Sequence, residues 1–149
     1  MSNPFYEVAN ELKDWQENSD TFVLGLVQEE EALLIDLNLS QLEAGINADG
    51  SEIEPEYTEY TKIIKRSEGR PWDRVALYDE GKYYKGWFIV YGADYFAFGS
   101  DDSKARSLER KYGKGMYGLT KENLQEAIDV LRPLIIKLFS EKILSKAKV

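Results

Sequence analysis

The sequence predicts an α+β fold in which helices at both ends of the chain pack around a small antiparallel sheet within residues 75–99. Apolar residues recur every three or four positions before residue 45 and again after residue 120, which is typical of amphipathic helices. Residues 87–98 are instead rich in aromatic and β-branched side chains, which favours strands. A chain of 149 residues can bury a core, so we expect a single domain over 1–149.

Residues 1–45 form the acidic helical part of the predicted domain. A first apolar stripe predicts a helix over 4–17, and Asn18-Ser19-Asp20 are expected to end it because these residue types favour caps and turns. A second stripe predicts a helix over 21–37, followed by a short helix or turn over 38–44. The first stripe consists of Phe5, Val8, Ala9, Leu12 and Trp15.

Residues 46–74 form a long irregular central segment. Its first five residues carry the strongest turn signal in the chain, and the acidic stretch 51–60 is expected to be extended. Only Thr61–Arg66 favour a helix, of a single turn. Loops of this length are uncommon in compact domains unless they are functional. We therefore expect an arm that docks on a partner and becomes ordered on assembly.

The antiparallel strands are predicted within residues 75–99. Residues 87–91 have a clear strand composition, and Gly92-Ala93-Asp94 can form the hairpin turn that leads to a second strand over 95–98. A short third strand is predicted over 74–78 because its residues are mostly apolar.

Residues 100–149 form the second helical part. We expect a short charged helix over 100–112 and a long final helix that begins after Thr120. Pro133 lies within the apolar pattern of the final helix. Since proline lacks a backbone N–H, it is expected to kink or restart that helix.

Charge is distributed unevenly along the chain. Residues 1–60 hold fifteen Asp and Glu and one Lys, which gives −14, whereas residues 61–149 hold eighteen Lys and Arg and twelve Asp and Glu, which gives +6. Together they account for the net charge of −8. This division predicts an acidic and a basic face that can meet between copies of the chain or between the chain and a neighbour. The alternative is that acidic helices simply form a soluble surface.

The chain contains no Cys and no His. This composition excludes disulfides, thiolate chemistry and nucleophile pairs that rely on His within one chain. We therefore expect a non-enzyme with no catalytic residue, cofactor, metal ion or small-molecule substrate. We also expect no membrane partner, because no segment has the ~18 uninterrupted apolar residues that a spanning helix needs.

One acidic turn invites comparison with a calcium loop. If Gly50 stood at the sixth position of such a loop, Glu56 would fall at the twelfth, but Gly45 would stand at the first, where an acidic ligand is required. We therefore expect Asn47–Ser51 to be a polar turn.

A basic and aromatic run follows the acidic stretch. It can be a solvated surface, a contact with an acidic protein face, or a grip on nucleic-acid backbone. A sequence pI near 4.7 argues against nucleic acid as the main partner. The basic residues are Lys62, Lys65, Arg66, Arg70 and Arg74, and the aromatic residues near them are Tyr57, Tyr60 and Trp72.

A set of motifs within residues 35–90 resembles a known group of proteins. The motifs are Ile35-Asp36-Leu37-Asn38, Gln41-Leu42, Gly45-Ile46-Asn47-Ala48-Asp49-Gly50, Tyr57, Tyr60-Thr61-Lys62, Lys65, Gly69-Arg70-Pro71-Trp72-Asp73-Arg74-Val75-Ala76-Leu77 and Asp79-Glu80-Gly81-Lys82-Tyr83-Tyr84-Lys85-Gly86. This region resembles small tailed-bacteriophage virion proteins, especially those of Bacteroides phages, and more distantly the head–tail joining and tail-completion proteins.

The resemblance implies a structural rather than a chemical role. In such proteins a strand enters a Thr-Gly-aromatic turn that opens a short helix before a strand hairpin, and here Glu80 stands at the threonine position. The implied function is a ring-forming head–tail connector or tail-completion subunit, found in the virion and, during assembly, in the host cytoplasm. Its implied partners are copies of itself and neighbouring virion proteins.

Aromatic and arginine side chains carry much of the energy of protein interfaces. We therefore expect the partner contacts to involve Tyr57, Tyr60, Lys62, Arg70, Trp72, Arg74, Tyr83 and Tyr84. The alternative function is a soluble inhibitor that mimics DNA, in which the carboxylates of residues 1–60 would imitate phosphates and occupy a nucleic-acid-binding host protein.

Overall fold

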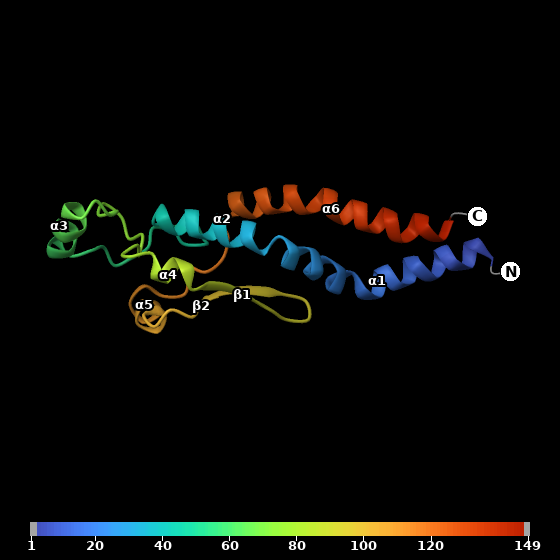
Figure 1. The fold of residues 1–149 in the computed structure, drawn as a ribbon, viewed down its shortest axis with the longest axis horizontal. Helices are drawn as coiled ribbons and strands as arrows, with labels where there is room; N and C mark the ends of the chain where they lie inside the picture. The colour runs from blue at the N-terminus through green and yellow to red at the C-terminus, as the bar shows by residue number, and fades with distance from the viewer. Residues whose placement is uncertain (1–2, 148–149) are drawn as a thin grey trace.

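The computed structural model describes residues 3–147 and confirms the predicted α+β class (Figure 1). Within these residues there are six helices and one two-stranded antiparallel sheet. The molecule is elongated: α1 and α6 lie side by side and reach the end where both termini lie, and the smaller elements gather towards the other end. The elements are α1 (Pro4–Glu29), α2 (Glu31–Glu43), α3 (Glu59–Ser67), α4 (Lys82–Lys85), β1 (Trp87–Tyr91), β2 (Phe96–Ser100), α5 (Ala105–Tyr112) and α6 (Lys121–Ala147).

Helix α1 begins where the sequence predicts but does not end at residue 17. The Asn3 side chain accepts a hydrogen bond from the backbone N–H of Phe5 at 3.0 Å, as a helix cap does. Asn18 leaves the helical conformation (φ −120°, ψ 16°), and its side-chain amide donates to the carbonyl and carboxylate of Asp14. The predicted break is therefore confirmed at Asn18, but as a kink between two segments of one helix and not as the end of the helix.

The helical boundary that the sequence does not reveal lies at Glu30. Its backbone (φ −98°, ψ 19°) separates α1 from α2, so the predicted helix over 21–37 is divided, and the predicted short element over 38–44 is the second half of α2. The new direction of the chain allows α2 to bury Leu34 and Leu42. Tertiary packing thus decides this boundary rather than a local capping signal.

Helix α6 spans Lys121–Ala147 with Pro133 inside it, so the predicted restart is wrong. Proline removes one backbone hydrogen bond from a helix. Apolar residues on both sides of Pro133 nevertheless pack inward: Leu131 lies against the core, and the Phe139 ring meets the Trp15 ring of α1 edge to face at 5.0 Å. These contacts hold both segments of α6 against the molecule.

The sheet contains two strands rather than three. β1 pairs with β2 in antiparallel register from Trp87 opposite Ser100 to Tyr91 opposite Phe96, so the strand over 87–91 is confirmed and its partner begins one residue later than predicted. The predicted strand over 74–78 is wrong. Val75, Ala76 and Leu77 are buried without forming a ladder, since Leu77 has a positive φ of 53° and its N–H donates to the Tyr57 hydroxyl.

The two remaining elements depart from their predicted bounds. The charged helix α5 begins at Ala105 rather than at residue 100, because β2 extends to Ser100. In the central segment α3 has nine residues, more than the single turn that the sequence predicts. Thr58 caps it by accepting a hydrogen bond from the N–H of Thr61.

The core consists of two clusters. One contains residues from α2, the central segment, α4, β1 and α5, and the other lies where α1, α2 and α6 meet the hairpin. Ile53 and Tyr57 belong to the first cluster, so the central segment contributes to the core of the chain as well as carrying α3. Within residues 3–147 no helix is long and apolar enough to cross a membrane.

Candidate protein-binding groove

A groove of about 340 Å³ lies between α3, the segment 77–83 and α5. We call it the aromatic groove, since four tyrosines line it. Helix α3 supplies one wall, α5 supplies the other, and the residues between Leu77 and Tyr83 form the base. Its aromatic and apolar lining residues are Tyr57, Tyr60, Ile64, Leu77, Tyr83, Leu108 and Tyr112.

The base of the aromatic groove is held by buried tyrosines. Tyr57 is 7% exposed and Tyr83 is 5% exposed. The Tyr57 hydroxyl accepts a hydrogen bond from the Leu77 N–H at 2.9 Å, and burial raises the pKa of Tyr57. The Tyr83 hydroxyl lies 2.9 Å from that of Tyr117, and burial raises the pKa of Tyr83 to about 12. The base is therefore neutral and fixed in position before any partner arrives.

The mouth of the groove is formed by side chains on α3. Tyr60 is 75% exposed and Ile64 is 38% exposed. They are four residues apart, so they lie on one face of the helix. An exposed aromatic next to a fixed apolar base is the kind of surface on which interface energy concentrates.

Charged side chains surround the groove without giving it a net charge. Asp79 forms salt bridges with Arg70 and, at 3.4 Å, with Lys104. Glu80 pairs with Lys82 at 2.9 Å, and the hydrogen bond from Lys82 lowers the pKa of the Glu80 carboxyl. Four cations line the groove, Lys65, Arg70, Lys82 and Lys104, as do four carboxylates, Glu68, Asp79, Glu80 and Asp102. This balance favours an apolar protein segment over a polyanion.

Lys65 differs from the other cations because its contacts face inward. Its ammonium donates to the Tyr78 carbonyl at 2.6 Å and lies 4.9 Å from the centre of the Tyr57 ring. Burial, followed by the nearby charge of Arg70, lowers the pKa of Lys65. This residue therefore ties α3 to the base of the groove.

A smaller hollow of about 110 Å³ adjoins Tyr57 and is lined partly by the segment before α3 and the segment after it. The guanidinium of Arg66 lies 5.0 Å from the centre of the Trp72 ring, and Arg74 donates to the Glu43 carbonyl. Lys62 forms salt bridges with Glu56 at 3.3 Å and Glu59 at 3.0 Å. These contacts fix the ends of the loop that carries α3.

The two hollows account for seven of the eight predicted contact residues. Tyr57, Tyr60, Arg70 and Tyr83 line the aromatic groove, and Tyr57 also lines the smaller hollow together with Lys62, Trp72 and Arg74. Because Tyr57 and Tyr83 are buried, they offer a partner only the surface at the base of a hollow.

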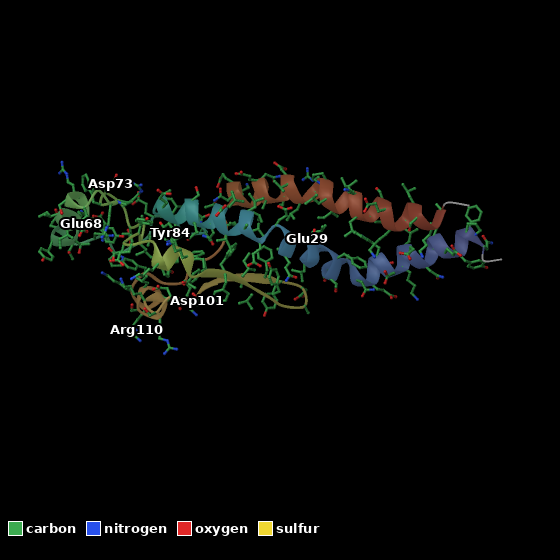
Figure 2. The ribbon with its side chains drawn as sticks, in the orientation of Figure 1. Glu29, Glu68, Asp73, Tyr84, Asp101 and Arg110 are labelled. Atoms are coloured by element: carbon green, nitrogen blue, oxygen red, sulfur yellow. The ribbon has the colours of Figure 1, made fainter. Side chains whose placement is uncertain are left out.

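Tyr84, the eighth predicted residue, lines neither hollow. Its hydroxyl donates to the Ala76 carbonyl at 2.6 Å, and its ring meets the Tyr78 ring edge to face at 5.2 Å. Burial raises its pKa. Figure 2 places Tyr84 at α4, and it places Glu68 and Asp73 around the outer end of the molecule near α3.

Sequence reasoning missed the apolar residues that complete the groove, namely Ile64, Leu77, Leu108 and Tyr112. One signal was present: Ile64 follows Tyr60 by four residues, so a helix of more than one turn would have placed both on the same face. The contributions of Leu77 and of α5 depend on tertiary structure that no local pattern indicates.

The acidic turn over Asn47–Ser51 is a polar turn, as predicted. The Asp49 carboxylate accepts hydrogen bonds from the N–H and the hydroxyl of Ser51, and these bonds lower its pKa. Glu56, the residue at the twelfth loop position, pairs with Lys62 instead. Among the residues that the structure describes, no three Asp or Glu side chains are grouped so that they could hold a metal ion.

Comparison with known proteins identifies no relative: no family model, curated protein or solved structure matches the chain. The proposal for its function therefore depends on the residues of the chain and on the geometry of the groove.

Proposed function

We propose that this protein is a structural subunit that acts through protein–protein contacts in a tailed-bacteriophage particle, as a ring-forming head–tail connector or tail-completion subunit. The observation that carries the contact function is the aromatic groove, with its fixed tyrosine base, exposed Tyr60 and balanced charge. The assignment to a phage particle rests on the resemblance within residues 35–90.

The chemistry of the groove suits an apolar side chain from a neighbouring protein. Its apolar and aromatic lining consists of Tyr, Leu and Ile. Six of the eight charged residues that line it form salt bridges within the chain, and the other two, Lys65 and Asp102, hydrogen-bond to backbone groups. A partner that inserts an apolar group would cover Tyr60 and Ile64 without leaving a buried charge unpaired, which would be costly.

The shape of the molecule also supports a role in assembly. The aromatic groove lies at the α3 end, whereas α1 and α6 extend to the opposite end (Figure 1). A subunit with different surfaces at its two ends can join its neighbours head to tail, and such contacts form rings when the rotation closes.

The charge arrangement gives less support to the DNA-mimic alternative. Helix α1 has six carboxylates and one Lys, for a net charge of −5, but α6 lies beside it with five Lys and Arg and four carboxylates. Lys146 lies 3.9 Å from Glu11, and the Lys142 ammonium lies 4.2 Å from the centre of the Phe22 ring. A mimic of DNA needs an uninterrupted acidic face, and these cations interrupt it.

The test is incorporation into phage particles. Cells that are infected with a phage encoding the protein are supplied with wild-type protein or with an α3 variant. The phage particles are then purified and washed, and mass spectrometry measures how much of the supplied protein they contain. Ile64→Asp is expected to reduce incorporation strongly, because it places a carboxylate at the groove. Ile63→Asp is the matched control: Ile63 is 67% exposed on the same helix and does not line the groove.

Two results would contradict the proposal. One is the absence of the wild-type chain from washed particles. The other is equal incorporation of the Ile64→Asp and Ile63→Asp proteins. Recovery of the chain as a monomer bound to a basic host protein would favour the DNA-mimic alternative.

A further inference from the structure

The outer parts of α1 and α6 form a helical pair with almost no buried residue. We call residues 4–20 and 132–147 the stalk. Val27 is the only buried residue in α1 and Ala127 the only one in α6, and both lie outside the stalk. Within the stalk, large apolar side chains are open to solvent: Phe5 is 84% exposed, Leu12 46% and Ile136 58%.

Phe5, Leu12 and Ile136 belong to a continuous row on each helix, whereas the exposed Tyr6 and Leu144 lie off the rows. Successive members are three or four residues apart, so each row follows one side of its helix. The row on α1 contains no charged residue, and the row on α6 contains one, Arg132. The rows are Phe5, Val8, Leu12, Gln16, Ser19 and Val23 on α1, and Gln125, Ile128, Arg132, Ile136, Phe139 and Ile143 on α6.

The two rows lie on the same side of the pair. Three residues of α1, Glu11, Trp15 and Phe22, contact Phe139, Lys142 and Lys146 of α6. At about 100° per residue, the centre of each row is rotated in the same sense away from the centre of the contact residues on its helix, and Phe139 lies on the side of the α6 row nearest α1. Because the helices are antiparallel, equal senses of rotation place both rows on one face.

Where the chain covers this face, the row is part of the core. Val23 packs against the core cluster that contains Val27, as do Tyr91 and Phe96 of the hairpin. The hairpin ends partway along α1, as Figure 1 shows, with a hollow of about 300 Å³ at its tip between Asp20 and Tyr95. Beyond that point, Leu12 and Phe5 continue the row uncovered. The α1 row is therefore covered by the hairpin at Val23 and is open to solvent in the stalk.

We infer that a second copy of this chain covers the stalk face, so that two stalks form a four-helix arrangement. The copies are expected to point the same way, with α1 of each copy lying against α6 of the other. Helix α1 has a net charge of −5 and α6 of +1, so this arrangement separates the two acidic helices. The hairpin of each copy lies against the Val23 end of the α1 row, so the copies are expected to diverge beyond the stalk.

The area of the stalk face is sufficient for a reversible dimer. Seventeen helical residues span about 25 Å, and two helices side by side are about 20 Å wide. The face is thus about 500 Å² per copy, or about 1,000 Å² in total, which is near the lower limit for a specific interface. We therefore expect monomer and dimer to exchange as the protein concentration changes.

The test is analytical ultracentrifugation of the full chain over a range of concentrations, with circular dichroism to verify folding. Wild type is expected to show a concentration-dependent dimer. Gln16→Glu adds charge to the row without removing an apolar contact and is expected to weaken the dimer about tenfold or more, because one carboxylate per copy must be desolvated. Gln28→Glu, off the row on the same helix, is the matched control and is expected to leave the dimer unchanged.

Cysteine cross-linking tests the arrangement, since the natural chain has no Cys to interfere. When the Leu12→Cys protein is mixed with the Ile143→Cys protein and oxidised, a disulfide between the two copies is expected. Glu17 lies on the other side of α1, so the Glu17→Cys protein is expected to form no such disulfide with the Ile143→Cys protein. A protein that stays monomeric at all concentrations would overturn the inference, and so would a dimer that Gln16→Glu and Gln28→Glu affect equally.

Discussion

At the scale of single residues, a few buried polar side chains hold elements that are distant in sequence. Asn38 is fully buried in α2; its amide donates to the Met116 carbonyl at 2.9 Å, and its carbonyl accepts from the Gly118 N–H at 2.8 Å. Gln41, one turn later, binds the Gly118 carbonyl and the Thr120 N–H in the same way. Two amide side chains thus replace the backbone pairing that the loop before α6 lacks.

Replacement of Asn38 by Ala is expected to lower the free energy of unfolding by about 2–5 kcal/mol, because the buried Met116 carbonyl loses its partner at about 1–3 kcal/mol and the partly buried Gly118 N–H loses its partner at about 1–2 kcal/mol. Urea denaturation measures the change. Asn10→Ala, at an exposed position of α1, is the control and is expected to change stability by less than about 0.5 kcal/mol. An equal effect of the two substitutions would show that the bonds of Asn38 contribute nothing.

The tyrosine network beneath the aromatic groove predicts a loss of stability at alkaline pH. Burial raises the pKa of Tyr83 from 10.0 to about 12, so the folded state keeps its proton at pH values at which the unfolded state has lost it. The contribution of the group is therefore complete below pH 10 and is lost as the pH rises towards about 12. In urea titrations, the Tyr83→Phe protein is expected to lose less stability than the wild-type protein between pH 10 and about 12. If both proteins lost the same amount, the alkaline loss of stability would not be due to Tyr83.

At the scale of elements, the sequence predicted those parts whose pattern is local. The strand over 87–91 was recognisable because aromatic and β-branched residues precede a Gly-containing turn, and the start of α1 was recognisable from Asn3 and Pro4. The run 74–78 has a similar composition, but it is buried by contacts with Tyr57 and Tyr84 instead of a ladder. Burial explains apolar composition in both cases, and only the fold distinguishes them.

The candidate site was predicted in the same uneven way. Tyr60 and Arg70 stood out because of their residue type and their position beside an acidic stretch, and both line the aromatic groove. Tyr83 was chosen for its residue type, but burial makes it part of the base. Leu77 and Leu108 were missed because nothing in the sequence distinguishes them from core leucines, and only the tertiary fold places them in the lining of the groove.

Pro133 provides a prediction at the scale of one helix. It is exposed and lies inside α6, where proline costs about 3 kcal/mol relative to Ala. Pro133→Ala is therefore expected to stabilise the protein by about 1–3 kcal/mol, measured as a higher midpoint in thermal unfolding. A lower midpoint would mean that the backbone geometry at Pro133 is needed for α6 to follow α1.

At the scale of the whole molecule, charge that is divided along the sequence is partly recombined in space. The acidic α1 and the more basic α6 come from opposite ends of the chain and lie side by side (Figure 1). The sequence could not reveal that α1 and α6 pack together, because this depends on how the segments between them fold back. The two surfaces proposed for partners, the aromatic groove and the stalk face, both carry little net charge.

These two surfaces lie at opposite ends of the molecule, so their functions are expected to be independent. Gln16→Glu should weaken dimerisation and leave the groove able to bind its partner, whereas Ile64→Asp should do the reverse, and the double variant should show both defects with no additional effect. Ultracentrifugation and particle incorporation measure the two properties separately. If Ile64→Asp alone abolished self-association, the groove of one copy would be receiving a part of the next, and the head-to-tail ring contact, not paired stalks, would be the self-association measured in solution.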